Sequence, residues 1–282
     1  MKKSLLALAV LGAFAGVASA QSSVTLYGTL DLSGKYVKND GSAKRYSLSQ
    51  DGINSSQLGI KATEDLGGGL KAGFVLLSGI NADSGTANQQ FWNRRATVSL
   101  WGNFGEVRLG RDYTPTFWND TIFDAFGTNG LGDSSHVLQM STASFVRANN
   151  SVGYFLPSGI GGVYGQVMAA ASEGASGPSL YGTTVGNNQG RYVGGRVGFA
   201  AGPFDVAVAY ATQRMDAIAS APSQKTFNVG GSYDLSVVKL MGYFDQDKLS
   251  YTGVDKKENR YSLSAVVPFG QSEIHEIGRA HV

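Results

Sequence analysis

Apolar and polar residues alternate along most of the chain. Val24, Leu26 and Leu30 are separated by polar or small residues. The same period of two recurs at residues 57–63, 204–213, 227–233, 238–245 and 261–267. Because successive side chains of a β-strand point to opposite faces, this pattern predicts an all-β chain of roughly twelve strands. The stretch at residues 113–145 lacks the alternation.

Two architectures with many alternating strands fit this pattern. A soluble sandwich or barrel turns its polar face to water, whereas a barrel of the outer membrane turns its apolar face to lipid. Several runs are about ten residues long, which is the length of a tilted strand that crosses a bilayer. Tyrosine and phenylalanine lie near the ends of the runs, and tight glycine turns alternate with long polar loops. These features favour a transmembrane antiparallel β-barrel.

Composition excludes several classes of site. The 282 residues include 39 glycines and no cysteine, so disulfide scaffolds, thiolate metal sites and cysteine nucleophiles are excluded. Charged residues make up 16% of the chain, below the value of about 25% that is usual for soluble domains. The formal net charge is +2, which gives no basic bias toward nucleic acid.

The N-terminus has the features of a secretory signal peptide. Lys2 and Lys3 precede an apolar run at residues 5–17, and small residues at 18–20 predict cleavage before Gln21. The alternative is a membrane-anchoring helix, but the apolar run is shorter than the about 20 residues that a spanning helix needs. Residues 1–20 are therefore expected to be removed during export.

Motifs for catalysis or metal binding are incomplete. His275 and Glu276 begin like a zinc-protease helix, but the second histidine is at the wrong spacing. Asp245 and Asp247 resemble the start of a calcium loop, but Leu249 occupies a ligand position. No nucleophile elbow or phosphate-binding loop is present in the sequence. The sequence thus predicts no catalytic residue, no metal site and no cofactor.

Five segments carry a resemblance to a known family. They are SVTLYGTLD at residues 23–31, SQLGIKATEDLGGGL at 56–70, NRRATV at 93–98, NFGEVRLGR at 103–111 and RANNSVGY at 147–154. With these segments in order, the chain resembles the general porins of Gram-negative outer membranes, of the betaproteobacterial type. The resemblance covers essentially residues 1–270.

The resemblance implies an outer-membrane diffusion channel for small hydrophilic solutes and ions. Such porins are sixteen-stranded barrels, usually homotrimers, and each subunit has a water-filled pore. The third external loop, here residues 112–145, is expected to fold inward and narrow the pore. Outer-membrane lipid, lipopolysaccharide and the barrel-assembly machinery are the further partners that it implies. The alternative from another class is a secreted β-sandwich or an adhesin-type binding protein.

The resemblance also implies arginines on the pore wall that face acidic residues on the inward loop. Opposed charges at a narrow constriction set which ions pass. The wall candidates are Arg94, Arg95, Arg147, Gln57 and Lys61. Arg94 matches the family motif, whereas alternation favours Arg95. The motif makes Arg94 the preferred pore residue, and the other arginine is expected to lie near a membrane–water interface or to face a neighbouring subunit.

Arg147 is expected to share the pore face with Ser151. The family commonly has an arginine at the position of Gln57, so this substitution weakens the expected anion preference.

Three aspartates on the inward stretch are candidates for the acidic side of the constriction. Asp133 is the first choice, followed by Asp124 and Asp120. Each could instead be an ordinary acidic residue on a solvated loop. Asp124 could also anchor the loop through hydrogen bonds.

The alternation breaks after Gly270. Porins of this family typically end in an aromatic residue, whereas residues 271–282 do not alternate and end in valine. The barrel domain is therefore expected to be residues 21–270, about three quarters of a sixteen-stranded barrel. Residues 271–282 are expected to be a non-family tail, the alternative being a divergent natural terminus. An open seam is predicted between the strand at Val24 and the strand at Tyr261.

Overall fold

The computed structural model describes residues 23–38, 41, 43–87, 90–130, 132–133, 143–172, 190–214, 223–251, 254–270 and 272–281. The strands are β1 (Ser23–Thr29), β2 (Leu32–Val37), β3 (Arg45–Gln50), β4 (Gln57–Gly67), β5 (Leu70–Asn81), β6 (Thr86–Ala87), β7 (Arg95–Gly102), β8 (Gly105–Tyr113), β9 (Arg147–Phe155), β10 (Val163–Ala170), β11 (Tyr192–Ala201), β12 (Phe204–Arg214), β13 (Ser223–Asp234), β14 (Lys239–Tyr251), β15 (Val254–Phe269) and β16 (Ser272–His281). The helices are α2 (Pro115–Phe123) and α3 (Ala143–Val146). The predicted signal peptide lies outside these residues.

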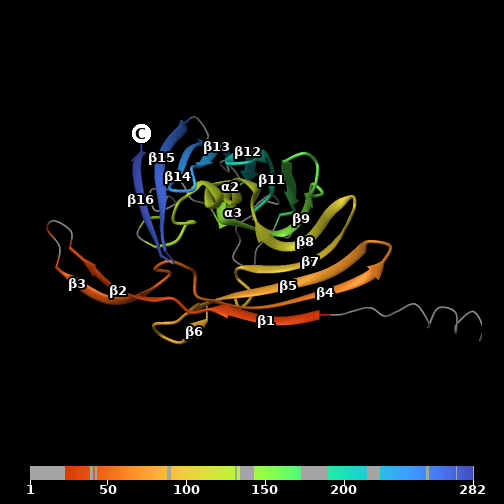
Figure 1. Ribbon diagram of the computed structural model, residues 1–282, viewed down its shortest axis with the longest axis horizontal. Helices are drawn as coiled ribbons and strands as arrows, with labels where there is room; N and C mark the ends of the chain where they lie inside the picture. Colours follow the sequence, from red (N-terminus) through yellow and green to blue (C-terminus); the bar gives the residue numbers. More distant parts are fainter. Residues whose placement is uncertain are drawn as a thin grey trace, which may run out of the picture.

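One antiparallel sheet of 14 strands makes up most of the fold. Its strands pair in the order β1-β4-β5-β7-β8-β9 and then in chain order to β16, with β6 beside β5. β2 and β3 form a separate hairpin. The sheet curls around α2 and α3 (Figure 1), and the connection that carries these helices is the third of the long ones. The all-β, antiparallel barrel fold with an inward third loop is thus confirmed.

The two ends of the sheet differ from the prediction. β1 and β16 end the pairing path, and no hydrogen-bonded ladder joins them within the described part of the chain. The expectation that the strand at Tyr261 is the last one is wrong, because β16 pairs with β15 from Phe269↔Ser272 to Arg260↔His281. A ladder is made by backbone groups, so an edge strand can form without a clear alternation of side chains.

The expected strand count is also too low. The described residues form sixteen strands, where the alternation predicts roughly twelve. The additional strands are the β2–β3 hairpin within the first long connection, the two-residue β6 and the terminal β16. Short or exposed strands such as these have too few alternating positions to be recognised from their sequence.

The faces of the sheet have the opposite polarity from those of a soluble protein. On β7, Val98 is 59% exposed on the outer face, whereas Thr97 and Ser99 are buried on the inner face. On β13, Phe227 is likewise exposed while Asn228 is buried. An apolar outer face and a polar interior are the arrangement of a barrel in lipid. This polarity argues against the soluble sandwich.

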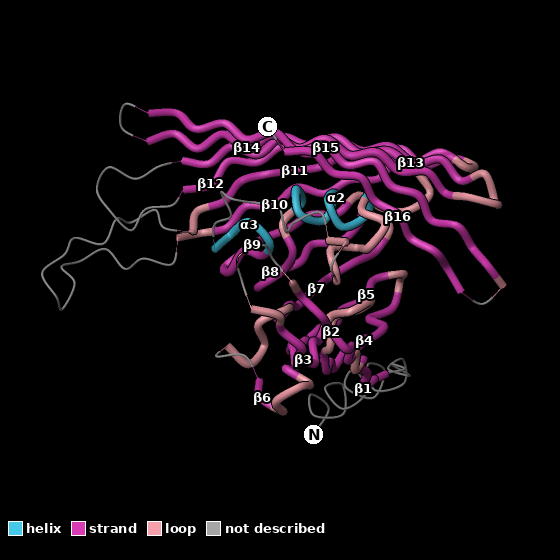
Figure 2. Tube along the Cα trace, turned by 90° about the vertical axis from the view of Figure 1, so that its left-hand side faces the viewer, coloured by secondary structure: helices cyan, strands magenta, loops and turns pink. Residues whose placement is uncertain are grey.

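The two helices lie on the concave side of the sheet (Figure 2). α2 contacts the inner faces of β10 to β14, and α3 leads directly into β9. Within the described ranges, no helix combines the length and the apolar character needed to cross a membrane. Their contacts with the wall and their place on the concave side show that both helices narrow the space inside the curled sheet.

Candidate functional site

The inward stretch begins with a capped helix. Thr114 is the N-cap of α2, and its hydroxyl oxygen accepts a hydrogen bond from the backbone N–H of Phe117 at 3.4 Å. Pro115 follows at the first helical position, where its missing N–H leaves no internal bond unmade. The Thr–Pro pair was the local signal for a helix here, although the absence of alternation alone predicts only a loop.

Asp124 ends the helix and fixes the turn that follows. Its carboxylate oxygens accept hydrogen bonds from the backbone N–H groups of Phe126 and Thr128, each at 3.0 Å. Asp124 is itself buried. The structure therefore places Asp124 in the anchoring position, which is the alternative to an acidic residue of the constriction.

Phe123 seats α2 on the wall of the barrel. It is fully buried beside Ala207 and Tyr243, and its ring lies against the backbone of Gly230. A Cβ atom at Gly230 would lie 2.3 Å from Cδ2 of Phe123, which is much closer than real Cβ contacts. Glycine at this position thus allows the helix to approach β13 closely.

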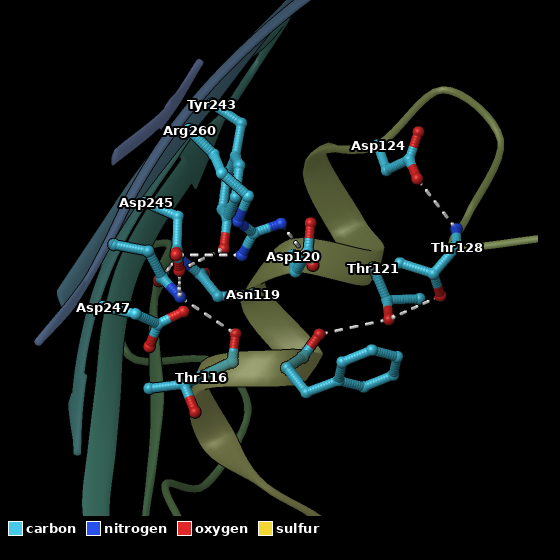
Figure 3. A network of polar contacts seen from close by, with 12 residues as sticks. Thr116, Asn119, Asp120, Thr121, Asp124, Thr128, Tyr243, Asp245, Asp247 and Arg260 are labelled. Atoms are coloured by element: carbon cyan, nitrogen blue, oxygen red, sulfur yellow. Dashed lines mark hydrogen bonds and ion pairs between the residues drawn. The ribbon is translucent and has the colours of Figure 1, made fainter. Parts of the chain in front are cut away.

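Polar groups on the same side of α2 bind the wall. The side-chain amide of Asn119 donates to the amide oxygen of Asn228 at 2.9 Å, and Asn228 donates to the carbonyl of Thr116 at 3.1 Å. Asp120 lies 3.7 Å from the guanidinium of Arg260 on β15. Figure 3 shows this network between the helix and the strands. Asp120 thus faces the wall and is completely buried.

The other side of α2 lines a cavity of about 810 Å³. Trp118, Thr121 and Asp133 lie on the side of the inward stretch, and Gln57, Arg94 and Arg147 lie on the side of the wall. Asp31, Lys35 and Asp51 from the first long connection complete the charged lining. The structure therefore brings Arg94, Arg147, Gln57 and Asp133 of the predicted set together around one space.

The inward stretch crosses this space and touches the first long connection. The Ser55 hydroxyl donates to the side-chain oxygen of Asn129 at 2.7 Å. Gly130 has a φ of 67°, and a Cβ atom there would lie 2.3 Å from the carbonyl oxygen of Gly52. Glycine is therefore required at this crossing for both its backbone conformation and its small size.

Arg94 lines the cavity and Arg95 pairs with the buried Asp112, so the expectation that only one of the two arginines points inward is wrong. Arg94 lies in a bend before β7 begins at Arg95, so strand alternation does not govern its direction. Arg95 extends along the inner face and pairs with Asp112 at 2.7 Å. Asp112 also pairs with Arg108, whose Nε lies 2.8 Å from Glu106.

Arg147 lines the cavity, and the strand is irregular between Arg147 and Ser151. Asn150 has a φ of 49°, and the register between β8 and β9 shifts at this point. Ala148 and Ser151 are consequently both buried, although they are three positions apart. Arg147 stands opposite Tyr113 in the register, donates to its hydroxyl at 2.8 Å and lies 4.4 Å from its ring centroid.

Lys61 is separated from the other wall candidates. It lines a second cavity of about 400 Å³ with Trp101, Arg108 and Phe155, which lie toward the short-turn end of the strands. Its ammonium group lies 5.6 Å from the ring centroid of Tyr27. The structure thus places Lys61 away from the cavity that α2 narrows.

Asp31 is a charged residue of the main cavity that is not among the predicted site residues. Its carboxylate accepts hydrogen bonds from the backbone N–H groups of Asn54 and Ile53 at 2.8 Å and of Gly52 at 3.0 Å. These bonds, led by the one from Asn54, lower the pKa of Asp31 below its usual value. Asp31 lies two residues after the end of β1, and this position at a strand end was the available sequence signal for a cavity residue.

Replacing Asp31 with asparagine is expected to loosen residues 52–54, because the neutral amide is a weaker acceptor for the three N–H groups. Their amides should exchange hydrogen faster. Since the folded-state pKa lies below the unfolded value, the stabilisation is present above the unfolded value and is lost as pH falls through the folded-state pKa. Asp65→Asn, which weakens the acceptor of the Gly67 N–H in the same way, is the control and should leave residues 52–54 unchanged.

Comparisons with known proteins agree with this geometry. A family model described as Gram-negative porin matches residues 7–275. Outer membrane porin protein 32 of Delftia acidovorans is 40% identical over 277 residues, which cover 96% of this chain and 77% of that protein. An outer membrane porin protein of Bordetella pertussis is 34% identical over 265 residues, which cover 85% of this chain and 68% of that protein.

A solved structure supports the same assignment. The anion-selective porin from Comamonas acidovorans superposes with a TM-score of 0.81 at 36% identity, covering 93% of this chain and 79% of that chain. The family match, the identity to porins and the inverted polarity of the sheet agree. The chain belongs to the Gram-negative porin family and is a non-enzymatic β-barrel diffusion channel of the outer membrane.

Proposed function

We propose that small hydrophilic solutes cross the membrane through the cavity beside α2, and that anions are favoured there by Arg94 and Arg147. The observation that carries this proposal is that these two guanidinium groups line the cavity without a carboxylate partner in the described part of the chain. Both line the cavity, and among the described residues neither forms an ion pair with a carboxylate. Their charge is therefore available to a passing anion.

Neighbouring arginines on the same wall differ in this respect. Arg95 and Arg108 share Asp112, and Arg108 also contacts Glu106. An arginine whose charge is balanced by a carboxylate a few ångströms away adds little net field to the channel. Arg95 therefore serves to hold the wall together, and the selectivity depends on Arg94 and Arg147.

The acidic groups of the cavity come from other segments of the chain than these arginines. Asp31 and Asp51 belong to the first long connection, and Asp133 belongs to the inward stretch. Asp31 accepts three backbone hydrogen bonds, and Asp51 accepts one from the N–H of Ser56 at 2.9 Å. Carboxylates held in this way repel anions less than free ones. The result is a transverse field with a modest preference for anions, reduced by the neutral Gln57.

The same proposal includes a homotrimer. The porin family supplies the expectation, and the outer face of the first strands fits it. Val24, Leu26 and Leu30 form an apolar row on β1 and beyond its end, each about 70% exposed. A row of this kind can be covered by lipid or by a second copy of the chain, and contact between copies would bury it.

One preparation of the purified protein tests the proposal. In detergent, its mass is expected to be that of three copies. In a planar bilayer with a gradient of potassium chloride, discrete current steps are expected. Their reversal potential should have the sign of the chloride equilibrium potential. A folded, heat-modifiable protein that produced no current steps would contradict the proposed conduction path. A reversal potential of the sign expected for potassium selectivity would contradict only the role of the arginines and would leave the conduction path in place.

A further inference from the structure

α2 has a side that faces the cavity and a side that faces the barrel wall. The side that faces the wall carries the charged residue and is buried. Trp118 and Thr121 line the cavity, whereas Asn119 and Asp120 face the wall and are fully buried. A helix of nine residues is too short to be stable alone in water, so its position depends on the contacts it makes. The contacts on the wall side therefore decide where the cavity side stands.

Arg260 is at the centre of the wall contacts. Its side chain is 3% exposed, and its two terminal nitrogens reach different elements. Nη1 lies 3.7 Å from Asp120 of α2, and Nη2 lies 2.9 Å from Asp245 of β14. Figure 3 shows the guanidinium between these two carboxylates. Because both pairs are shielded from water, each interacts more strongly than an exposed pair would.

Neutral groups on β13 and β14 hold the wall side of this network. Asp245 accepts hydrogen bonds from the amide of Asn228 and the hydroxyl of Tyr243, both at 3.3 Å. Asp247 accepts from Gln224 at 2.8 Å and from Thr226. Asp245 and Asp247 are thus fixed by the sheet, whereas Asp120 reaches the network only from the helix.

The three buried carboxylates of this network need the positive charge of Arg260. Asp120, Asp245 and Asp247 are buried within one network, and Arg260 is the guanidinium that the structure pairs with the first two. A buried carboxylate that loses its counter-charge is strongly unfavourable. If the bridge is broken on the helix side, α2 loses its charged contact with the wall, while Arg260 keeps Asp245.

We propose that Arg260 is a positioning residue of the channel, which bridges Asp120 of α2 to Asp245 of the wall and thereby fixes the width of the cavity. This inference rests on the proposed function, since it assigns the cavity beside α2 as the conduction path. Neither Arg260 nor Asp120 faces the solute. Both act through the placement of Trp118 and Thr121 on the opposite side of the helix.

The test compares Asp120→Asn with Asp247→Asn. Both remove one buried carboxylate of the same network, but only Asp120 belongs to α2. Hydrogen exchange of the α2 amides in detergent is the first measurement, and open-channel current noise and conductance in bilayers are the second. Asp120→Asn is expected to speed the exchange, to increase the noise and to change the conductance. Asp247→Asn is expected to leave all three close to those of the unchanged protein.

Arg260→Met and Arg260→Lys extend the comparison. The methionine variant should show the larger changes in exchange and noise, and the lysine variant should restore part of the original behaviour because it keeps the charge. Equal effects of Asp120→Asn and Asp247→Asn would overturn the positioning role and leave a simple charge effect. Unchanged exchange in Asp120→Asn would overturn it as well. The exchange result decides the inference even if the protein conducted no current, an outcome that would contradict the proposed function separately.

Discussion

Replacing Arg94 and Arg147 together with glutamine is expected to reverse the ion preference of the channel from anions to cations. The change removes the two guanidinium groups from the cavity and leaves three carboxylates in the described lining, those of Asp31, Asp51 and Asp133, against the one ammonium group of Lys35. A unit charge about 4 Å from a passing ion contributes about 4 kcal/mol at the intermediate dielectric constant near a protein surface. Loss of two such charges therefore exceeds the modest preference expected of the unchanged channel.

The reversal potential in a gradient of potassium chloride measures this effect. Arg214→Gln is the matched control, because Arg214 lies on the outer face at the end of β12 and does not line the cavity. It should leave the reversal potential unchanged. A double variant with lysine at both positions should remain anion-preferring. If the glutamine variant kept the chloride sign, the selectivity would have to come from charges elsewhere in the channel.

Alternation along the strands was sufficient to predict the inverted barrel. The outer position of Val98 and the inner position of Thr97 follow from the period of two once lipid is the outer medium. The same argument gave the wrong direction for Arg94, for a local reason. Arg94 precedes its strand in a bend, and the left-handed Asn150 likewise interrupts the period of two in β9. Neither a bend nor a bulge changes the sequence pattern enough to be recognised.

The seat of the inward helix could not be derived from the sequence. Asp245 and Arg260 are inner-face positions of their strands, and in a barrel with a polar interior such residues are ordinary members of the pattern. Their partner Asp120 is more than a hundred positions away from both. Periodicity assigns each residue to a face, but it contains no information on which helix a barrel wall will meet. The network therefore required the three-dimensional structure.

Gly230→Val is expected to unseat α2 and to destabilise the folded barrel by about 1–3 kcal/mol, which is the usual cost of overpacking a core. The reason is the 2.3 Å distance between a Cβ atom at Gly230 and Cδ2 of Phe123. Phe123 is fully buried against Ala207 and Tyr243, so its ring can move only by displacing its neighbours. The temperature at which the protein loses its compact form on a detergent gel measures the loss, and bilayer currents report the displaced helix.

Gly231→Val provides the control on the adjacent position. The nearest atom to a Cβ there is the carbonyl oxygen of Asp205 at 3.5 Å, which is an ordinary contact. This variant should cost much less than Gly230→Val. The distances therefore predict a difference between two neighbouring glycines of the same strand, and equal losses would show that valine disturbs β13 itself rather than the helix above it.

Phe123→Ala separates the two explanations further. Alone, it is expected to cost about 3–5 kcal/mol, because it leaves a cavity between α2 and the wall. In the double variant Gly230→Val/Phe123→Ala, the valine side chain enters that cavity. The total loss in the free energy of unfolding should therefore be smaller than the sum of the two single losses by about 0.5–3 kcal/mol. Strict additivity would contradict direct contact between residue 230 and residue 123. Partial recovery of stability without recovery of the original conductance would show that packing and Arg260 contribute separately to the position of α2.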